Sequence, residues 1–450
     1  MTDTVDRTMH WTCAAVLLLA VGCGPAGTTT GPVTWWRDIA PIAETYCNGC
    51  HREGGIGPFP LNSYDEAGPR APLIAAMTES RRMPPWPPAA AGCRPLQNPR
   101  VLTDAQIALI RRWSDMGAPE GNRADYVAPT QRMDPFPPTG DITVQPADPY
   151  LPRPVGNDDY HCFILDPQLT ATRDVIGFRV TPGNGAIVHH MLLFEVRQAA
   201  LAQLQTLDDG EPGPGYTCFG GPRVSANLRA APAGSGEVLQ FDEQQIGGWA
   251  PGSPPTPFPA GTGIRLAAGS RLVMQVHYNV RSTSAGMTDR PRVDLYLSPT
   301  PVVSQAMWVP EAQTRFTIPA GAAAGSPSAQ IAASPTNWSL PLRLWGIAPH
   351  MHMRGRSIRV DLAQPTGTTE CLVNIPNWNF HWQQAYWYVA PLRTQALGPG
   401  RTTQTTLRCG YDNSQANQPV IDGMQAAPHD LHWGEGSDDE MCLDYHYVTF

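Results

Sequence analysis

The chain has 450 residues, which is long enough for about three domains. It contains 42 glycines and 48 prolines and only 16% charged residues, a composition that favours turn-rich β structure over long helices. The formal net charge of -8 comes from dispersed acidic residues, and no run of lysine and arginine could neutralise a phosphate backbone, so nucleic acid is excluded as the partner.

Residues 1–23 predict export from the cytoplasm. The apolar run at residues 13–21 has the length of a signal-peptide core and is shorter than the ~20 residues that a membrane-spanning helix needs. Gly22 before Cys23 resembles the bacterial lipoprotein signal, whose cysteine becomes the lipid-modified N-terminus; an ordinary cleaved signal peptide is the alternative. Because Gly24 rather than aspartate follows, we expect an outer-membrane lipoprotein that faces the periplasm and touches the membrane only through its lipid. Disulfides are permitted there.

The sequence Cys47-Asn48-Gly49-Cys50-His51 predicts a covalently attached haem c. In this spacing the two thiols add to the vinyl groups of the haem, and the adjacent histidine binds the iron. A chance occurrence of the pattern or half of a zinc site is the alternative.

Helical patterns precede and follow this motif. Residues 35–46 lead into it, and residues 102–116 form a second amphipathic stretch with a capping sequence at its start. We therefore expect residues 33–125 to form a small α-helical cytochrome c domain.

The haem iron of such a domain either has a sixth ligand or keeps an open position. Met83 lies on a proline-stiffened loop, Arg82-Met83-Pro84-Pro85, where a thioether can be held rigidly against the iron. We predict Met83 as the axial ligand. Met77 and Met116 are the alternatives, and core packing is the usual role of a single methionine.

The rest of the chain is predicted to be β structure. Residues 126–154 contain eight prolines and little periodic pattern, which indicates a semi-rigid connector or an extended strap. Beyond them, short apolar strands such as 175–180 and 272–276 alternate with glycine and proline turns, and no helix of comparable strength is expected. This pattern predicts β-sandwiches.

Two pairs of histidines are candidate metal ligands. His350 and His352 are two residues apart, so in a strand both face the same way and can bind one metal. His189 and His190 are adjacent and would point to opposite faces of a regular strand. For these two, a shared metal requires a β-bulge or a strand end.

A third feature is His277, which shares its strand face with Gln275. Each histidine taken alone is more often structural than a ligand, but the set together indicates metal binding. Imidazoles suit zinc, copper, nickel or iron, so they do not choose the metal, whereas a thioether ligand would favour copper(I).

Four motifs, in this order, resemble the type II copper, ascorbate-dependent monooxygenases, the family of peptidylglycine α-hydroxylating monooxygenase and dopamine β-monooxygenase. The resemblance covers residues 155–450. The motifs are Val188-His189-His190-Met191-Leu192-Leu193-Phe194, Gln275-Val276-His277-Tyr278, His350-Met351-His352 and Asp439-Glu440-Met441-Cys442.

The resemblance implies two antiparallel, jelly-roll-like β-sandwich domains, at residues 155–303 and 304–450, with one copper ion each. It implies an enzyme that hydroxylates an sp3 C–H bond of a small substrate with O2. Two electrons, from ascorbate or another one-electron donor, pass one through each copper. The implied ligands of the electron-storing copper are His189, His190 and His277, those of the copper at the reaction site are His350, His352 and Met441, and Gln275 and Tyr445 complete the expected catalytic set.

The family pattern also suggests two disulfides. It pairs Cys162 with Cys218 in the first sandwich and Cys409 with Cys442 in the second. Cys93 and Cys371 stay unassigned, and they either pair across domains or remain free thiols.

The sequence departs from the family in its substrate residues. Ala348 stands where peptide-hydroxylating members have an arginine, and Leu443 replaces an asparagine, so a clamp for a substrate carboxylate is largely missing. Glycine-extended peptides are therefore not expected as substrates. The aromatic segment 377–383 is either a substrate wall or core packing.

The haem domain is the other departure, because the animal enzymes lack one. A tethered haem would pass electrons from a periplasmic donor to the first copper at high effective concentration. Two alternatives remain: a non-catalytic electron-transfer or copper-handling lipoprotein with the same haem and coppers, and sandwiches that hold no metal.

Overall fold

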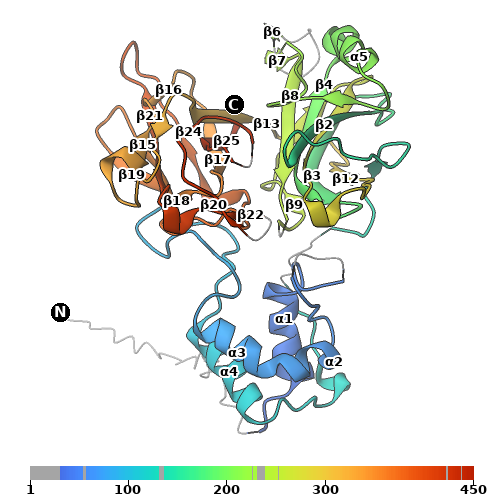
Figure 1. Ribbon diagram of the computed structural model, residues 1–450, viewed down its shortest axis with the longest axis vertical. Coiled ribbons are helices and arrows are strands. Elements are labelled where there is room, and N and C mark those ends of the chain that lie inside the picture. Colours follow the sequence, from blue (N-terminus) through green and yellow to red (C-terminus); the bar gives the residue numbers. More distant parts are fainter. Residues whose placement is uncertain are drawn as a thin grey trace, which may run out of the picture. The chain divides into compact units, whose positions relative to one another are not determined.

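A computed structural model describes residues 31–53, 57–130, 136–225, 227–230, 239–251, 253–421, 424–436 and 438–450. The predicted export signal and its lipidation site, Cys23, lie outside these residues. The chain from Val33 to Phe450 forms one compact unit, in which a helical region is followed by β-sheets (Figure 1).

The helical region contains both helices that the sequence predicts. The first is a π-helical turn, η1, that continues directly into α1, and the second, α4, begins at a capping box formed by Thr103 and Gln106. The segment between them holds α2 and α3, which the sequence did not predict. The helix α2 begins at a capping box formed by Ser63 and Glu66, and α3 has a proline in its first turn, where its missing N–H costs nothing. The elements are η1 (Trp35–Ile39), α1 (Ala40–Tyr46), α2 (Tyr64–Ala67), η2 (Gly68–Arg70), α3 (Ala71–Glu79), α4 (Asp104–Asp115) and η3 (Arg123–Asp125).

Most of the remaining chain forms antiparallel sheets. The largest contains nine strands: β1 (Ile142–Val144), β3 (Arg173–Thr181), β9 (Thr256–Pro257), β10 (Thr262–Leu266), β12 (Arg292–Leu297), β13 (Ser304–Gln313), β17 (Arg343–His350), β20 (Tyr386–Arg393) and β25 (Cys442–Thr449). One five-stranded sheet contains β2 (Asp158–Leu165), β4 (Val188–Val196), β5 (Tyr216–Thr217), β8 (Glu243–Trp249) and β11 (Arg271–Asn279). The other contains β15 (Gln330–Ala332), β16 (Thr336–Trp338), β18 (Gly355–Ala363), β19 (Thr369–Ile375) and β21 (Thr403–Tyr411).

Smaller elements complete the β region. Three strand pairs are β6 (Leu228–Ala230) with β7 (Leu239–Phe241), β14 (Thr317–Ile318) with β24 (Leu431–His432), and β22 (Val420–Ile421) with β23 (Met424–Gln425). Short helices are η4 (Gln198–Ala200), α5 (Leu201–Asp209), η5 (Ser282–Ser284), η6 (Pro327–Ala329) and η7 (Gln415–Asn417). The sequence predicted no helix of comparable strength beyond the linker, and α5, with 9 residues, is shorter than the 12-residue α4.

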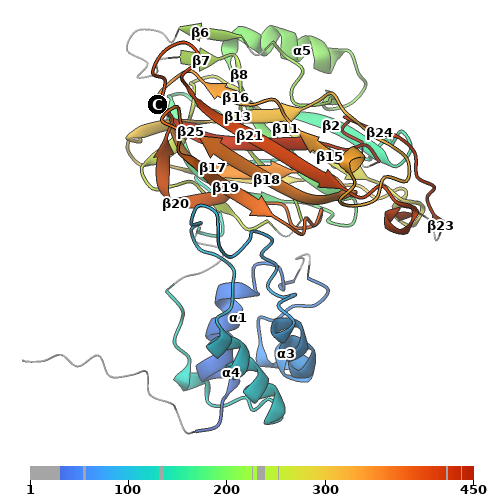
Figure 2. The same cartoon turned by 90° about the vertical axis from the view of Figure 1, so that its left-hand side faces the viewer.

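The nine-stranded sheet contributes strands to both halves of the β region. The expectation of two separate antiparallel sandwiches did not include such a shared sheet. Its halves join where β10 pairs with β13 in parallel, Thr262 opposite Ser304. The five-stranded sheet with β11 packs on the half that contains β3, and these two form the first pair of sheets. The five-stranded sheet with β21 packs on the half that contains β25, and these two form the second pair of sheets. Apolar side chains fill the space within each pair (Figures 1 and 2). The fold is thus mostly β and sandwich-like, with one large apolar core in each half of the β region.

The alternation of side chains on β11 agrees with the sequence prediction. Met274 and Val276 point into the first core, whereas Val273 packs in a separate cluster on the outer face of the sheet. Gln275 and His277 share that outer face with Val273 because side chains two residues apart point the same way.

Part of the predicted linker, residues 126–154, belongs to the β region. Its strand β1 pairs with β12 at the edge of the nine-stranded sheet, where prolines before and after a short strand are tolerated. The Phe136 ring stacks on Tyr296 with centroids 3.9 Å apart, and Arg179 donates to the carbonyl oxygens of Pro137 and Pro138. Residues 136–144 therefore form a strap on the first sheets rather than a free tether.

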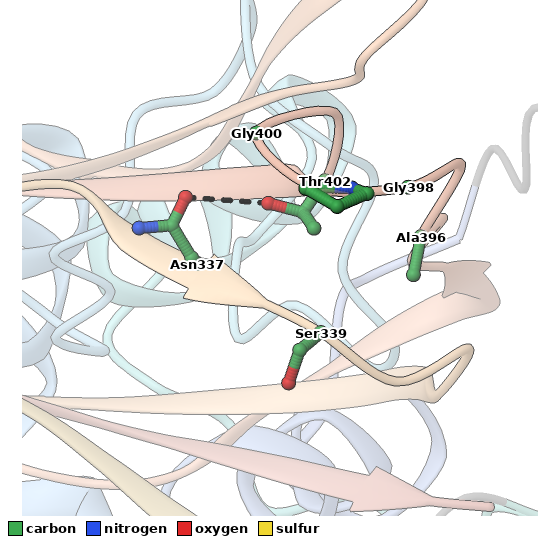
Figure 3. A pocket seen from close by; sticks show the side chains of 7 residues that line it. Asn337, Ser339, Ala396, Gly398, Gly400 and Thr402 are labelled. Carbon is green, nitrogen blue, oxygen red and sulfur yellow. Dashed lines mark hydrogen bonds between the residues drawn. The ribbon is translucent and has the colours of Figure 1, made fainter.

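A surface hollow lies beside β16 on the second pair of sheets (Figure 3). Thr402 donates to the Asn337 side chain across it, and its lining is otherwise small and uncharged. None of the predicted site residues lines it, so it is no candidate for the chemistry.

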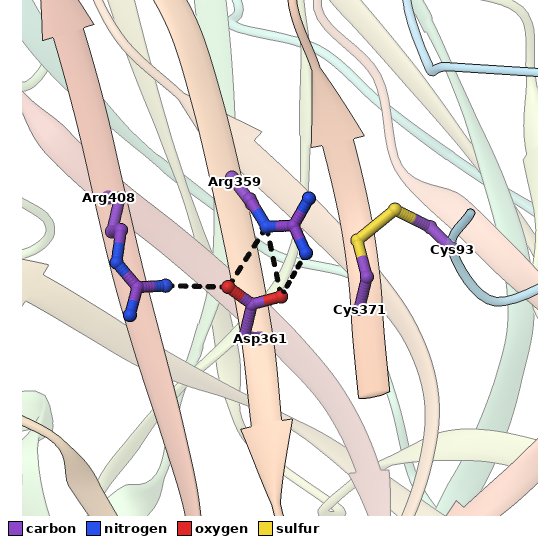
Figure 4. Close-up of a disulfide and its surroundings, with 5 residues drawn as sticks. All are labelled: Cys93, Arg359, Asp361, Cys371 and Arg408. Atoms are coloured by element: carbon purple, nitrogen blue, oxygen red, sulfur yellow. Dashed lines mark hydrogen bonds and ion pairs between the residues drawn. A yellow bond between two sulfur atoms is a disulfide. The ribbon is translucent and has the colours of Figure 1, made fainter. Parts of the chain in front are cut away.

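Residues 89–97 fall within the predicted cytochrome c domain but contact the second pair of sheets. Cys93 forms a disulfide with Cys371 of β19, beside an ion-pair group in which Asp361 lies 2.7 Å from Arg359 (Figure 4). Ala89 N also donates to the Asn374 carbonyl at 2.8 Å. Of the two alternatives for Cys93 and Cys371, the structure has the pair.

The two disulfides that the resemblance implied are present as well, Cys162–Cys218 and Cys409–Cys442. Three disulfides indicate an oxidising compartment. Among the described residues, no helix has the length and apolar character to cross a membrane.

Candidate metal centres

The first candidate centre lies at the outer face of the first five-stranded sheet. His190 of β4 is opposite His277 of β11, but the next pair along is Val188 with Tyr278, so His189 is an extra residue in its strand. This is the β-bulge that a shared metal was predicted to require. It lets two adjacent histidines turn toward one point.

The three imidazoles meet through their Nδ1 atoms. Nδ1 of His190 lies 3.2 Å from Nδ1 of His189 and 3.3 Å from Nδ1 of His277. Two nitrogens that bind one ion at ~2.0–2.1 Å are roughly 3.3 Å apart at a tetrahedral angle. The separations are therefore those that a single ion would produce.

Neighbouring groups orient the His277 ring and keep the His189 imidazole neutral. The carboxylate of Asp158 lies 2.9 Å from Nε2 of His277, which orients the ring and leaves Nδ1 to bind, and Tyr160 stacks on the same ring. Burial, followed by the nearby His277, lowers the pKa of His189 to about 3. The imidazole of His189 is thus neutral at neutral pH, the form that binds a metal.

Asp158→Asn should weaken metal binding at this centre by about 10–100-fold, because the amide can still accept a hydrogen bond but lacks the negative charge that faces the His277 ring. A competition titration with a chromophoric chelator measures the effect. Asp166→Asn, a surface change at the opposite end of the same strand, is the matched control. Equal affinities in the Asp158 and Asp166 variants would show that the carboxylate does not support the site.

The second candidate centre contains His350, the last residue of β17, and His352 just beyond it. Their rings are 5.1 Å apart. Nδ1 of His350 lies 2.5 Å from Oε1 of Gln383, and Nδ1 of His352 lies 3.0 Å from the carbonyl oxygen of Asp439. Both oxygens can only accept, so each Nδ1 carries the proton and each Nε2 is left with its lone pair for a metal.

Burial also keeps these two imidazoles neutral. It lowers the pKa of His350 to about 4 and that of His352 well below its usual value. The second centre, like the first, is therefore set to bind a cation rather than a proton at neutral pH.

Met441 lies on the same side of the sheet as His350. His350 is opposite Leu443 across β17 and β25, so Met441, two residues earlier, is its diagonal neighbour on that face. The buried carboxylate of Glu440 accepts hydrogen bonds from the backbone N–H of His352 at 2.9 Å and of Met441 at 3.3 Å. Glu440 thus links the backbones of two predicted ligands, His352 and Met441.

Phe380 connects the two centres. Its ring stacks on His189 with centroids 4.6 Å apart and lies 5.9 Å from the ring of His352. In the same aromatic segment, Trp378 packs in the second core, and Gln383 holds His350. Trp378 therefore has the core role that was one of the two alternatives, and a substrate wall in this segment stays a prediction.

Gln275 and Tyr445 lie near one loop of the second pair of sheets. Gln275 is buried and its side chain hydrogen-bonds Glu435. Burial, followed by the charge of Glu435, raises the pKa of Tyr445 to about 12, so its hydroxyl is a neutral donor. Ala348 is directly opposite Tyr445, on the same face.

The haem motif follows α1. Nδ1 of His51 lies 2.9 Å from the carbonyl oxygen of Phe59 and donates to it, so Nε2 is left for an iron. Cys47 and Cys50 are not in a disulfide, and burial raises the pKa of the Cys47 thiol to about 12. The residues present fit a covalently attached haem.

The predicted axial ligand, Met83, lies beside Met77, one of its two alternatives. Met83 N donates to the carbonyl oxygen of Met77 at 3.1 Å, and both side chains are half-buried, whereas Met116 is 46% exposed. The choice of Met83 over Met77 remains a prediction.

Sequence reasoning missed the residues that support the ligands: Asp158, Gln383, Phe380 and Glu440. Glu440 lies inside a motif that was singled out, and its position beside Met441 was the available signal. Phe380 and Gln383 lie in the aromatic segment 377–383, which was singled out for a different role, whereas Asp158 reaches His277 only through the pairing of β2 with β11.

No protein-family model matches the chain, and no curated protein matches it. Solved structures with some likeness are a subviral particle of the infectious bursal disease virus protein VP2 (10% identity, 68% of this chain, 77% of that chain, TM-score 0.17) and allantoicase (12% identity, 65% and 83%, TM-score 0.14). A third is a two-domain protein of unknown function from Bacteroides fragilis (5% identity, 64% and 94%, TM-score 0.16). These scores carry no argument about fold or activity.

Proposed function

We propose that the protein is an exported copper-dependent monooxygenase that hydroxylates an sp3 C–H bond of a small substrate. The observation that carries the proposal is the pair of histidine groups with free ligating nitrogens, Nδ1 in the first and Nε2 in the second, that both contact the ring of Phe380. An electron-storing metal and a reacting metal need this proximity.

The donor set supports copper. The first centre offers three imidazoles and the second two imidazoles with the thioether of Met441 nearby, and a thioether favours copper(I) over zinc. When bound, copper would supply the electrons and the activation of O2. The chain would hold the ions through His189, His190, His277, His350, His352 and Met441.

The residues around the second centre support an uncharged substrate. Ala348 and Leu443 share the sheet face of His350 and offer no cation for a carboxylate. Tyr445, on the same face, offers a hydroxyl that donates a hydrogen bond to a polar group of the substrate. Phe380 provides an apolar surface beside His352.

The N-terminal region supports a role in electron supply. A haem bound by Cys47, Cys50 and His51, with Met83 as sixth ligand, would accept electrons from a periplasmic donor; ascorbate would be an alternative source. The lipoprotein signal at Cys23 would hold the enzyme on the periplasmic side of the outer membrane, in keeping with three disulfides.

Met441→Ala should lower ascorbate-driven oxygen uptake by at least about 100-fold, because loss of a direct ligand costs more than the 10–100-fold seen for outer-shell changes. Haem content and copper at the first centre should stay unchanged. Met424→Ala, an exposed methionine, is the matched control.

Uptake that is indifferent to Met441 would contradict the proposal. Copper binding with no Met441-dependent oxygen consumption would instead favour a non-catalytic electron-transfer or copper-handling protein.

A further inference from the structure

Three ionisable side chains lie inside the core of the second pair of sheets. Cys442 and Val448 of β25 belong to this core, and Asp444 and His446 lie between them on the same face of the strand. Glu311 of the neighbouring strand β13 is directly opposite Asp444. None of the three belongs to the two centres described above.

These side chains are almost completely removed from water. Glu311 is 3% exposed, and Asp444 and His446 are 0% exposed. Nε2 of His446 lies 3.0 Å from a carboxylate oxygen of Glu311 and 3.3 Å from one of Asp444. One atom from each of the three lies within 4.8 Å of the other two.

The group is incompletely satisfied by the protein. Oε1 of Glu311 and Nδ1 of His446 have no hydrogen-bond partner among the described residues. The carboxylate of Asp444 has the backbone N–H groups of Tyr445 and Ala348 and Nε2 of His446 as its polar neighbours. The surrounding groups include the ring of Trp338, 5.1 Å from that of His446. Because burying carboxylates without enough positive charge is costly, the arrangement favours a compensating cation in the core.

A proton on His446 does not supply enough charge. Two carboxylates and one imidazolium leave a net charge of one negative unit in the core. A divalent cation with neutral His446 balances both carboxylates. It would also give Oε1 of Glu311 a partner.

We propose that Glu311, Asp444 and His446 form a third metal site, which holds one divalent cation of the zinc or manganese class. One imidazole nitrogen and carboxylate oxygens, without thiolate or thioether, suit these ions and give copper(I) no preferred ligand. The site lies on the opposite face of β25 from Met441 and Tyr445, so the ion would contact no substrate. The ion would stabilise β25, which carries Tyr445 and begins directly after Met441.

The direct test counts metals in protein purified from medium that contains copper, zinc and manganese. Besides haem iron and copper, we expect about one zinc or manganese ion per wild-type chain. Glu311→Gln and Asp444→Asn should each lose this ion and keep copper. Asp361→Asn, a carboxylate on the outer face of the same sandwich, should keep it. Wild-type protein without such an ion, or variants that retain it, would overturn the proposal.

A second measurement does not depend on whether the core variants fold. In a His189→Ala/His350→Ala protein treated with a chelator, ZnCl2 alone should bind with about one equivalent and raise the midpoint of thermal unfolding. Because that variant has lost a ligand at each copper centre, the result does not depend on copper or on monooxygenase activity. No zinc binding, or zinc binding without a change in the midpoint, would contradict a site in the core.

Discussion

His350→Ala should abolish ascorbate-driven oxygen uptake and lower the copper content by about one ion per chain, which is the largest effect that we expect of any single substitution. His350 is one of only two histidines at the second centre, and its Nδ1 is occupied by Gln383. The methyl group of alanine cannot replace the lost Nε2. The remaining donors, His352 and Met441, are too few to retain copper against a chelator.

His381→Ala is the matched control for this prediction. His381 lies in the same aromatic segment, with its ring 5.8 Å from Phe380, yet it belongs to neither ligand group. Its removal should change copper content and uptake little. Copper counts by mass spectrometry and an oxygen electrode measure both quantities, and equal losses in the two variants would mean that the segment, not the ligand, was disturbed.

Cys50→Ala should lower turnover driven by a periplasmic electron donor by at least about 100-fold and leave ascorbate-driven turnover intact. Loss of one attachment thiol prevents stable haem retention, and a tethered haem supplies electrons at an effective concentration that a free donor does not reach. Arg100 hydrogen-bonds the Cys50 side chain and, at 2.5 Å, Gln384. Gln384 is next to Gln383, so this contact leads toward His350.

Two methionine variants test which thioether binds the haem iron without removing the haem. Met83→Leu should keep the haem and lower its reduction potential, because a thioether ligand raises that potential, whereas Met77→Leu should not. Potentiometric titration gives both values. If Cys50→Ala kept its donor-driven turnover, the haem would not supply electrons to the copper centres. If only Met77→Leu shifted the reduction potential, Met77 rather than Met83 would be the axial ligand.

Local patterns in the sequence predict much of this protein. The two-residue spacing of His350 and His352 and the need for a bulge at His189 both follow from strand geometry, and the structure has the bulge at that position. Helix capping at Thr103 likewise locates α4. Such features depend on residues close to one another in the chain.

Features that depend on distant pairings could not be predicted. The parallel pairing of Thr262 with Ser304 joins the two expected sandwiches in one sheet. For Cys93 and Cys371, which are 278 residues apart, the sequence could not choose between a disulfide and two free thiols. The buried group of Glu311, Asp444 and His446 is of the same kind. In the sequence these are ordinary polar residues, and only the pairing of β13 with β25 brings them together.

The metal and haem content of the purified wild-type protein is the most direct test of the proposed function. We expect about two copper ions and one covalently bound haem per chain, measured by mass spectrometry of the metals and by haem absorbance after denaturation. A protein with haem but no copper after incubation with copper and ascorbate would contradict the proposed function.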